Sequence, residues 1–157
     1  MKKAFYFPIL LLAAITVLVA SCERYERVSI DIEKLGPFND TTKIINYIAH
    51  VTGDGGCARC IEAGYCYSYF DKEPSHTCYY TTVVPVVRDA ALVDSTGEYL
   101  SFIWTCQLPY IENVGNVDTT GGVAYDSTLY YFRSYIITNA GTSYSDKVDT
   151  VIVHSSY

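Results

Sequence analysis

Apolar and polar residues alternate along most of the chain from Arg27 onward, with the period of two that β-strands show when one face is buried. Groups of Gly, Pro, Asn, Asp and Ser separate the alternating stretches, and no stretch has a helical period of useful length. The pattern predicts an all-β fold, an antiparallel β-sandwich, in which Pro85 marks an edge strand or a break because proline donates no ladder hydrogen bond. The expected strands are residues 27–32, 43–51, 60–70, 78–87, 98–108, 129–138 and 147–154.

The beginning of the chain follows a different pattern. Lys2 and Lys3 precede an almost wholly apolar run, residues 4–20, and this is the layout of an export signal. The alternative is a retained transmembrane helix, but Pro8 and Thr16 interrupt the run and its length is marginal for a membrane span. We therefore expect the chain to be exported.

The stretch "VASC" that ends at Cys22 resembles the lipobox of bacterial lipoproteins. The resemblance implies cleavage before Cys22 and acylation of that residue, so that residues 1–21 form the signal peptide and residues 22–27 a lipidated tether. Glu23 and Glu26, close behind the anchor, resemble the surface-export signals of some Gram-negative lipoproteins. The expected location is the outer membrane with the protein exposed at the cell surface, and a periplasm-facing orientation is the alternative.

The charge of the chain narrows its partners. The whole chain has a net charge of −6, and loss of the signal peptide with its two lysines makes it −8. An acidic surface excludes nucleic acid as a partner, because nucleic-acid binding calls for clustered Lys and Arg. It also gives no attraction to anionic lipid, so contact with the membrane is expected only through the lipid anchor.

Several segments carry a family resemblance. "LYYFRSYIITNAGTSYSDKV", which begins at Leu129, is similar to the last two strands of fibronectin type III-like domains, and "GDGGCARCIEAGYCYS" and "EYLSFIWTCQL" resemble earlier strands of such domains in bacterial surface lipoproteins. The resemblance covers residues 28–153 and implies one such domain at 28–157, with an unusually long loop from Pro109 to Ser127. It also implies that two strands each turn one set of side chains to the core. On the strand that begins at Leu129 these are Tyr130, Phe132, Ser134 and Ile136. On the strand before it they are Leu100, Phe102, Trp104, Cys106 and Leu108.

Five cysteines lie outside the lipobox. Cys57 and Cys60 have the spacing of one zinc knuckle or of a redox motif, but no second knuckle follows and β-type segments flank the pair. Counting outward from the intervening turn puts Cys66 opposite Cys78, within reach of a disulfide. A small-loop bridge between Cys57 and Cys60 is a further alternative, as is a set of unpaired core and turn thiols. No cofactor is predicted.

Tyrosine is the most conspicuous residue type, with 16 copies in the chain. Exposed Tyr suits binding to a glycan or a protein, because its ring offers flat apolar area and its hydroxyl a hydrogen bond. The alternative is that Tyr serves only as a good strand residue on a half-wet face. Residues from two strands of one sheet are expected to form the binding face: Tyr65, Tyr67, Tyr131, Arg133 and Tyr135.

Catalytic motifs are not evident in the sequence. The Gly-rich residues 53–56 lack the Lys and the following helix of a phosphate loop, and they fit a turn between strands. The sequence predicts a non-enzymatic, lipid-anchored binding, adhesion or scaffold module of the cell envelope. One alternative is a carbohydrate-binding accessory lipoprotein that uses the Tyr face. A second is a metal or redox protein that uses Cys57 and Cys60.

The lipobox yields a first testable prediction. Cys22→Ala removes the thiol and the amino-terminal residue that would carry the acyl chains, so the variant should leave the membrane fraction. Fractionation of cells into membrane and soluble material measures this. If the variant stays membrane-bound, Cys22 is not the anchor.

Overall fold

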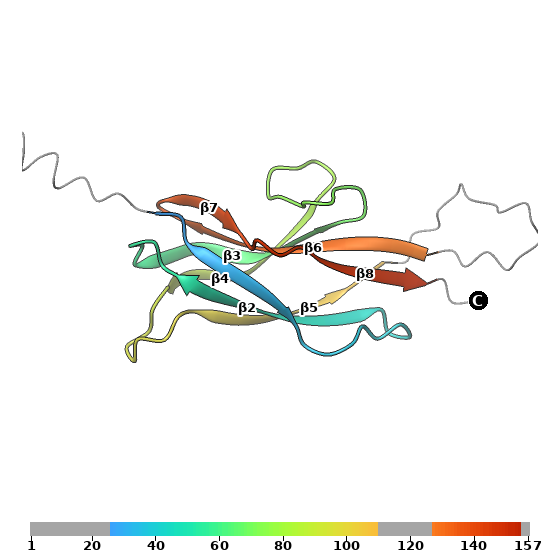
Figure 1. The fold of residues 1–157 in the computed structure, drawn as a ribbon, viewed down its shortest axis with the longest axis horizontal. Coiled ribbons are helices and arrows are strands. Elements are labelled where there is room, and N and C mark those ends of the chain that lie inside the picture. The colour runs from blue at the N-terminus through green and yellow to red at the C-terminus, as the bar shows by residue number, and fades with distance from the viewer. Residues whose placement is uncertain (1–25, 110–126, 155–157) are drawn as a thin grey trace, which may run out of the picture.

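The computed structural model describes residues 26–109 and 127–154, and this part of the chain consists of β-strands joined by turns and loops (Figure 1). One antiparallel sheet has the strand order β1-β2-β5, and the other has the order β4-β3-β6 with β7 and β8 both paired to β6. The predicted all-β architecture of two antiparallel sheets is confirmed. The strands are β1 (Ser29–Lys34), β2 (Ile44–Gly53), β3 (Arg59–Ser68), β4 (Thr82–Ala91), β5 (Ser101–Gln107), β6 (Ser127–Thr138), β7 (Gly141–Tyr144) and β8 (Asp149–His154).

The antiparallel partner of β6 is divided into two strands, β7 and β8, and the sequence pattern did not show this division. The first half of the long strand β6 pairs with β8 and its second half with β7. Between β7 and β8 lies Ser145, which is fully buried and bonded to β6: its N–H donates to the Ser134 carbonyl (2.9 Å), and its hydroxyl accepts from the Ser134 N–H (3.2 Å). A polar residue thus keeps the backbone groups at the break satisfied.

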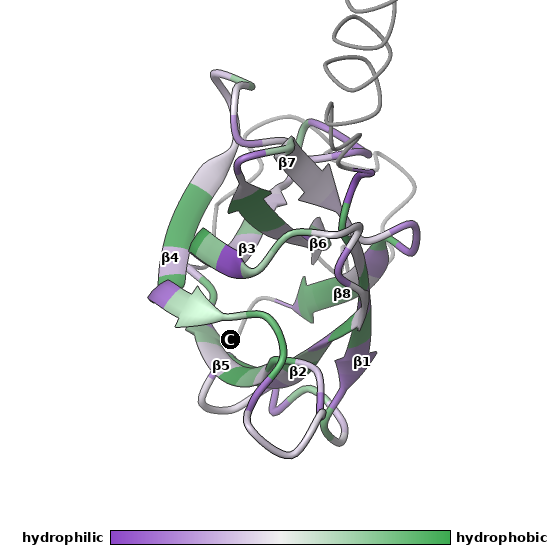
Figure 2. Cartoon of the chain, turned by 90° about the vertical axis from the view of Figure 1, so that its left-hand side faces the viewer, coloured by the Kyte–Doolittle hydropathy of each residue, from purple (hydrophilic) through white to green (hydrophobic). Residues whose placement is uncertain are grey.

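The core lies between the two sheets, which face each other in the view along the strands (Figure 2). At its centre, Trp104 of β5 stacks on Tyr65 of β3 across the sheets, with ring centroids 3.8 Å apart, and on Tyr47 of β2 at 4.4 Å. Both predicted sets of core residues are confirmed as inward-facing. Leu100 is half-buried against the core. The other members of the two sets are buried: Tyr130, Phe132, Ser134, Ile136, Phe102, Trp104, Cys106 and Leu108.

A polar contact also joins the two sheets. The hydroxyl of Tyr47 in β2 donates a hydrogen bond to Asp149 of β8 (2.7 Å), and Lys34 of β1 forms an ion pair with the same carboxylate (3.0 Å). Because the Tyr47 ring is buried, its hydroxyl needs such a partner. The contact fixes how the two layers sit against one another.

The edge strand β4 carries Pro85, as predicted, because β4 pairs only with β3. The ladder between these strands has an irregularity at Ala63 and Gly64, where Gly64 lies opposite Pro85. A Cβ atom on Gly64 would lie 2.1 Å from the Val84 carbonyl oxygen and 2.9 Å from the Pro85 Cα. Only glycine lets the two backbones approach this closely.

Some of the predictions concern residues outside the described ranges. Cys22, the rest of the signal segment and most of the loop from Pro109 to Ser127 belong to this group. Lipidation at Cys22 therefore stays a prediction. Within residues 26–109 and 127–154, no helix is long and apolar enough to cross a membrane.

The close approach at Gly64 predicts a stability effect. Gly64→Ala should lower the free energy of unfolding by about 2 kcal/mol, because the added methyl group meets backbone atoms that cannot move aside independently. The matched control is Gly53→Ala, whose Cβ would lie 3.7 Å from the nearest atom, Ser29 Oγ, at ordinary contact distance. Urea denaturation of both variants measures the difference, and equal stabilities would contradict the packing described for β3 and β4.

Candidate functional site

The predicted Tyr face does not exist as one surface. Tyr65 is buried against Trp104, and Tyr67 also points inward, since it lies opposite Phe132 in the ladder. The predicted partners of these residues, Tyr131, Arg133 and Tyr135, point to the other side of the sheet. The prediction was wrong because both faces of β3 are covered, so the alternation of Tyr with small residues did not mark an exposed side.

Tyr135 is fully buried although it lies on the outer face of its sheet. Its hydroxyl donates to the Glu62 carboxylate (2.8 Å), and its ring meets the His76 ring edge-on with centroids 5.3 Å apart. Glu62 also pairs with Arg88 (3.3 Å). Burial and the bond to Glu62 raise the pKa of Tyr135, so this phenol stays protonated and acts as a structural donor.

The predicted Cys66–Cys78 disulfide is also wrong. Val83, not Cys78, lies opposite Cys66, because a loop of 13 residues, 69–81, separates β3 from β4 in place of a tight turn. Cys57, Cys60, Cys66, Cys78 and Cys106 are all free thiols in the described part of the chain, so a Cys57–Cys60 bridge is absent there as well.

The surroundings of Cys57 and Cys60 do not favour redox or metal chemistry. Both are buried, and the Cys57 thiol donates to the Thr138 hydroxyl at 3.5 Å. Burial raises the pKa of Cys60 to about 11, which disfavours the thiolate that redox and metal chemistry need. Among the described residues, no group of three or more His, Cys, Asp and Glu side chains is placed to hold a metal ion.

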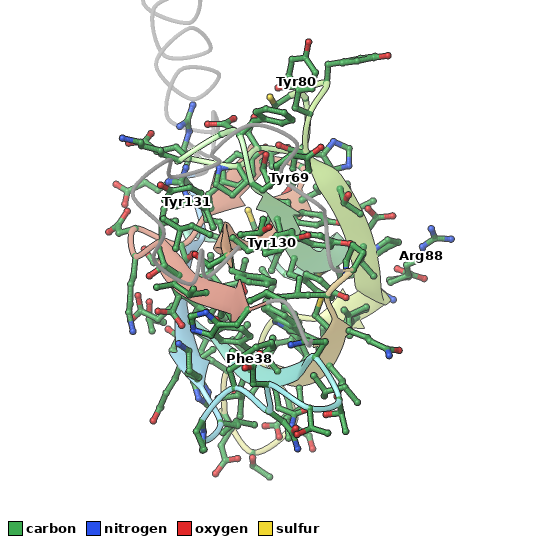
Figure 3. All side chains as sticks on the ribbon, turned by 90° about the vertical axis from the view of Figure 1, so that its right-hand side faces the viewer. Phe38, Tyr69, Tyr80, Arg88, Tyr130 and Tyr131 are labelled. Carbon is green, nitrogen blue, oxygen red and sulfur yellow. The ribbon has the colours of Figure 1, made fainter. Side chains whose placement is uncertain are left out.

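The loop between β3 and β4 presents aromatic side chains to solvent. We call Tyr69, Phe70, Tyr79 and Tyr80 the aromatic patch; their exposed fractions are 38, 64, 92 and 63%. The rings form a connected series, with centroids 4.2 Å apart for Tyr69 and Phe70, 5.4 Å for Phe70 and Tyr80, and 5.2 Å for Tyr79 and Tyr80. Tyr80 stands clear of the strands at the top of Figure 3, with Tyr69 between it and Tyr130.

The two ends of this loop are tied together at Ser68, the last residue of β3. Its buried hydroxyl donates to the Tyr80 carbonyl (2.9 Å) and accepts from the N–H groups of Phe70 (3.1 Å) and Asp71 (3.0 Å). One side chain thus fixes the backbone on both sides of the aromatic patch. The rings are attached to a defined loop rather than to a free strand end.

The middle of the loop is folded down onto the outer face of the sheet. Pro74 is fully buried, and its carbonyl accepts a hydrogen bond from the Cys66 thiol (3.2 Å). The His76 N–H donates to the Tyr144 hydroxyl of β7 (2.9 Å), and its Nε2 lies 3.9 Å from Glu62. These contacts explain how Tyr135 and Cys66 become buried on a face that would otherwise meet water.

A cleft of about 490 Å³ opens elsewhere, between the edge strands β1 and β7. Arg27 and Arg133 line it together with Asp31 and Asp146, so both signs of charge are present on its walls. The Arg133 guanidinium already lies over the Tyr144 ring, 5.0 Å from its centroid. The cleft therefore has no net charge that would select a ligand by sign.

The aromatic patch was missed in the sequence because its residues were assigned to strands. Phe70 follows Tyr69 directly and Tyr80 follows Tyr79, and adjacent side chains of a strand point to opposite faces. Paired aromatics on both sides of the polar stretch "DKEPSHTC" were the available signal for a loop. No model of a protein family, no curated protein and no solved structure matches the chain.

The buried thiols predict that the protein loses stability in base. Burial raises the pKa of Cys60, Cys66 and Cys106 to about 11, 12 and 11, against an ordinary value of 9.0. Above pH 9 these thiols ionise in the unfolded chain while the folded protein keeps them protonated. Ionisation therefore stabilises the unfolded state relative to the folded state. The free energy of unfolding should fall between pH 9 and 11 by at most about 1.4 kcal/mol per pH unit for each thiol.

Urea denaturation at a series of pH values, followed by Trp104 fluorescence, measures this slope. Cys66→Ala removes one of the three groups and should make the slope shallower. Val153→Ala, which truncates an equally buried side chain that carries no titrating group, is the matched control and should keep the slope of the unaltered protein. A constant free energy of unfolding from pH 8 to pH 10.5 would contradict the burial of the thiols.

Proposed function

We propose that the chain is a lipid-anchored, non-enzymatic binding module of the bacterial outer membrane, built on a single fibronectin type III-like domain at residues 28–157. The connections between the sheets support this fold type. The chain crosses from one sheet to the other between β2 and β3, between β4 and β5, and between β5 and β6. Such crossings are the Greek-key connections of immunoglobulin-like sandwiches.

The proposed anchor lies close to one end of the domain. The N–H of Glu26 donates to the Gly55 carbonyl in the turn between β2 and β3 (2.8 Å), and Cys22 is four residues before Glu26. Four residues span at most about 14 Å, so a lipid on Cys22 would hold this end of the sandwich next to the membrane. The strand ends at which the described chain begins would then face the lipid surface (Figure 1).

The aromatic patch lies away from that end. β3 begins next to the turn that contacts Glu26, and its ten residues carry the chain roughly 30 Å along the sandwich before the loop starts. This length is about twice the reach of the tether, and the loop rises from the five-stranded sheet well away from the entering chain (Figure 1). The patch would therefore be held clear of the membrane on the outer face of the five-stranded sheet, accessible to a partner (Figure 1).

Exposure of the patch is the observation that carries the proposal. Monomeric proteins seldom leave connected aromatic rings in water, and patches of this kind mark interaction sites. Tyr79, with 92% of its surface exposed, contributes almost nothing to the core, so packing does not account for its place. The partner class predicted from the sequence, a protein or a glycan, is kept, but the surface is the β3–β4 loop and not the two-strand Tyr face.

Of the two alternative functions, the metal or redox role receives less support from the geometry. A metal or redox role for Cys57 and Cys60 needs accessible thiolates, and both thiols are buried. The carbohydrate-binding alternative needs exposed aromatic rings, and the aromatic patch supplies them.

Site-specific photo-crosslinking in cells that produce the full chain tests the proposal. A benzophenone amino acid in place of Tyr80 should yield adducts on irradiation, because this position would touch the partner. The matched control is the same replacement of Ile103, which has nearly the same exposed fraction (62% against 63%) but lies on β5 in the other sheet.

The comparison of the two positions decides the result. Adducts at position 80 and few or none at position 103 support a binding surface on the loop. Equal labelling at both positions, or no adduct at position 80, contradicts it.

A further inference from the structure

The size of the aromatic patch restricts its partner. With about 200 Å² for each ring residue, the four exposed fractions leave roughly 500 Å² of aromatic side chain in water. A stable protein–protein interface needs about 800 Å² on each partner. The rings alone cover less than this area, so a ligand smaller than a protein interface is sufficient to bury them.

The charge around the patch restricts the partner further. The loop carries Asp71, Lys72 and Glu73, which leave it with one net negative charge, and the mature chain would carry −8. An acidic surface repels anionic ligands, including uronic acid polymers and nucleic acids. Lys72, Glu73 and His76 are exposed as well, and the other exposed groups of this part of the loop are neutral rings and hydroxyls, on Tyr79, Tyr80 and Thr77.

The shape of the patch favours an extended ligand over a compact one. A small molecule usually binds in a pocket that covers most of its surface, whereas Tyr79 projects into water and encloses nothing. The rings also differ in tilt, by 87° between Tyr79 and Tyr80 and by 56° between Phe70 and Tyr80. Such a surface suits a chain that passes over several rings rather than one unit held in a cavity.

We propose that the aromatic patch binds a neutral polysaccharide, whose pyranose rings pack their C–H faces on Phe70, Tyr79 and Tyr80 while their hydroxyl groups bond to the Tyr hydroxyls. This inference rests on the proposed function and names its ligand class. The Ser68 and Pro74 contacts hold the loop in place before the ligand arrives, which lowers the entropy that binding must overcome. Each contact is small, so the affinity comes from several rings acting on one polymer chain.

The test uses the full-length lipidated protein in detergent micelles and an immobilised panel of neutral glucans, mannans, xylans and galactans. The unaltered protein should be retained by at least one of them, with little change between low and high salt because the ligand is uncharged. Tyr79→Ala and Tyr80→Ala should each weaken binding about fivefold, and Phe70→Ala by a similar factor. Tyr80→Phe keeps the ring and should lose less than Tyr80→Ala.

The matched control is Ile103→Ala, which removes an equally exposed side chain from the other sheet and should bind as the unaltered protein does. Urea denaturation of each variant excludes loss of folding as the cause. Three outcomes overturn the inference: retention by none of the neutral polysaccharides, release by salt, or binding by the Phe70, Tyr79 and Tyr80 variants that equals binding by the unaltered protein.

The crosslinking experiment separates this failure from failure of the proposed function. An adduct at position 80 whose added mass glycosidases remove supports the glycan. An adduct with another protein, or a product of twice the chain mass from a second copy, overturns the glycan and leaves the binding function in place. Absence of any adduct removes the binding function itself.

Discussion

The stack of Tyr65 on Trp104 determines which way β3 faces, and most of the molecule follows from that direction. The rings lie 3.8 Å apart and almost parallel, at 9°, one from each sheet. Because side chains alternate along a strand, an inward Tyr65 forces Gly64 and Cys66 outward. An inward Cys66 and outward Tyr65 would remove this stack between the sheets and put a thiol in its place.

The small outward residues of β3 in turn allow the loop to lie on the sheet. Gly64 lets the Pro85 backbone approach, and Cys66 offers a thiol to the Pro74 carbonyl instead of a bulky ring. The loop therefore folds over the outer face, covers Tyr135 and directs its own aromatic residues into water. The exposed patch is therefore a consequence of the buried stack, because the alternation that turns Tyr65 inward also turns Gly64 and Cys66 outward.

The sequence pattern was sufficient for the architecture and for strands with one clear apolar face. Phe102, Trp104 and Cys106 alternate with polar residues on β5, so their inward direction could be predicted and was confirmed. β3 could not be assigned in this way because sheet and loop cover its two faces, and both of its alternating sets are therefore buried. The Cys66–Cys78 pairing failed for a related reason: it assumed a tight turn, and the register depends on a loop whose shape comes from contacts distant in sequence.

The exposed rings and the acidic charge have to be considered together. An aromatic patch in water favours association with a second copy of the chain, since burial of its rings would gain free energy. The net charge of −6 on the chain opposes that association by repulsion between copies, and it does so without reducing contact with an uncharged ligand. Charged side chains within the patch would also have kept it soluble, but they would have broken the continuous series of rings that runs from Tyr69 to Tyr79. The observed division, with rings on one loop and the excess of acidic groups spread over the chain, leaves the series of rings continuous while the net charge opposes self-association.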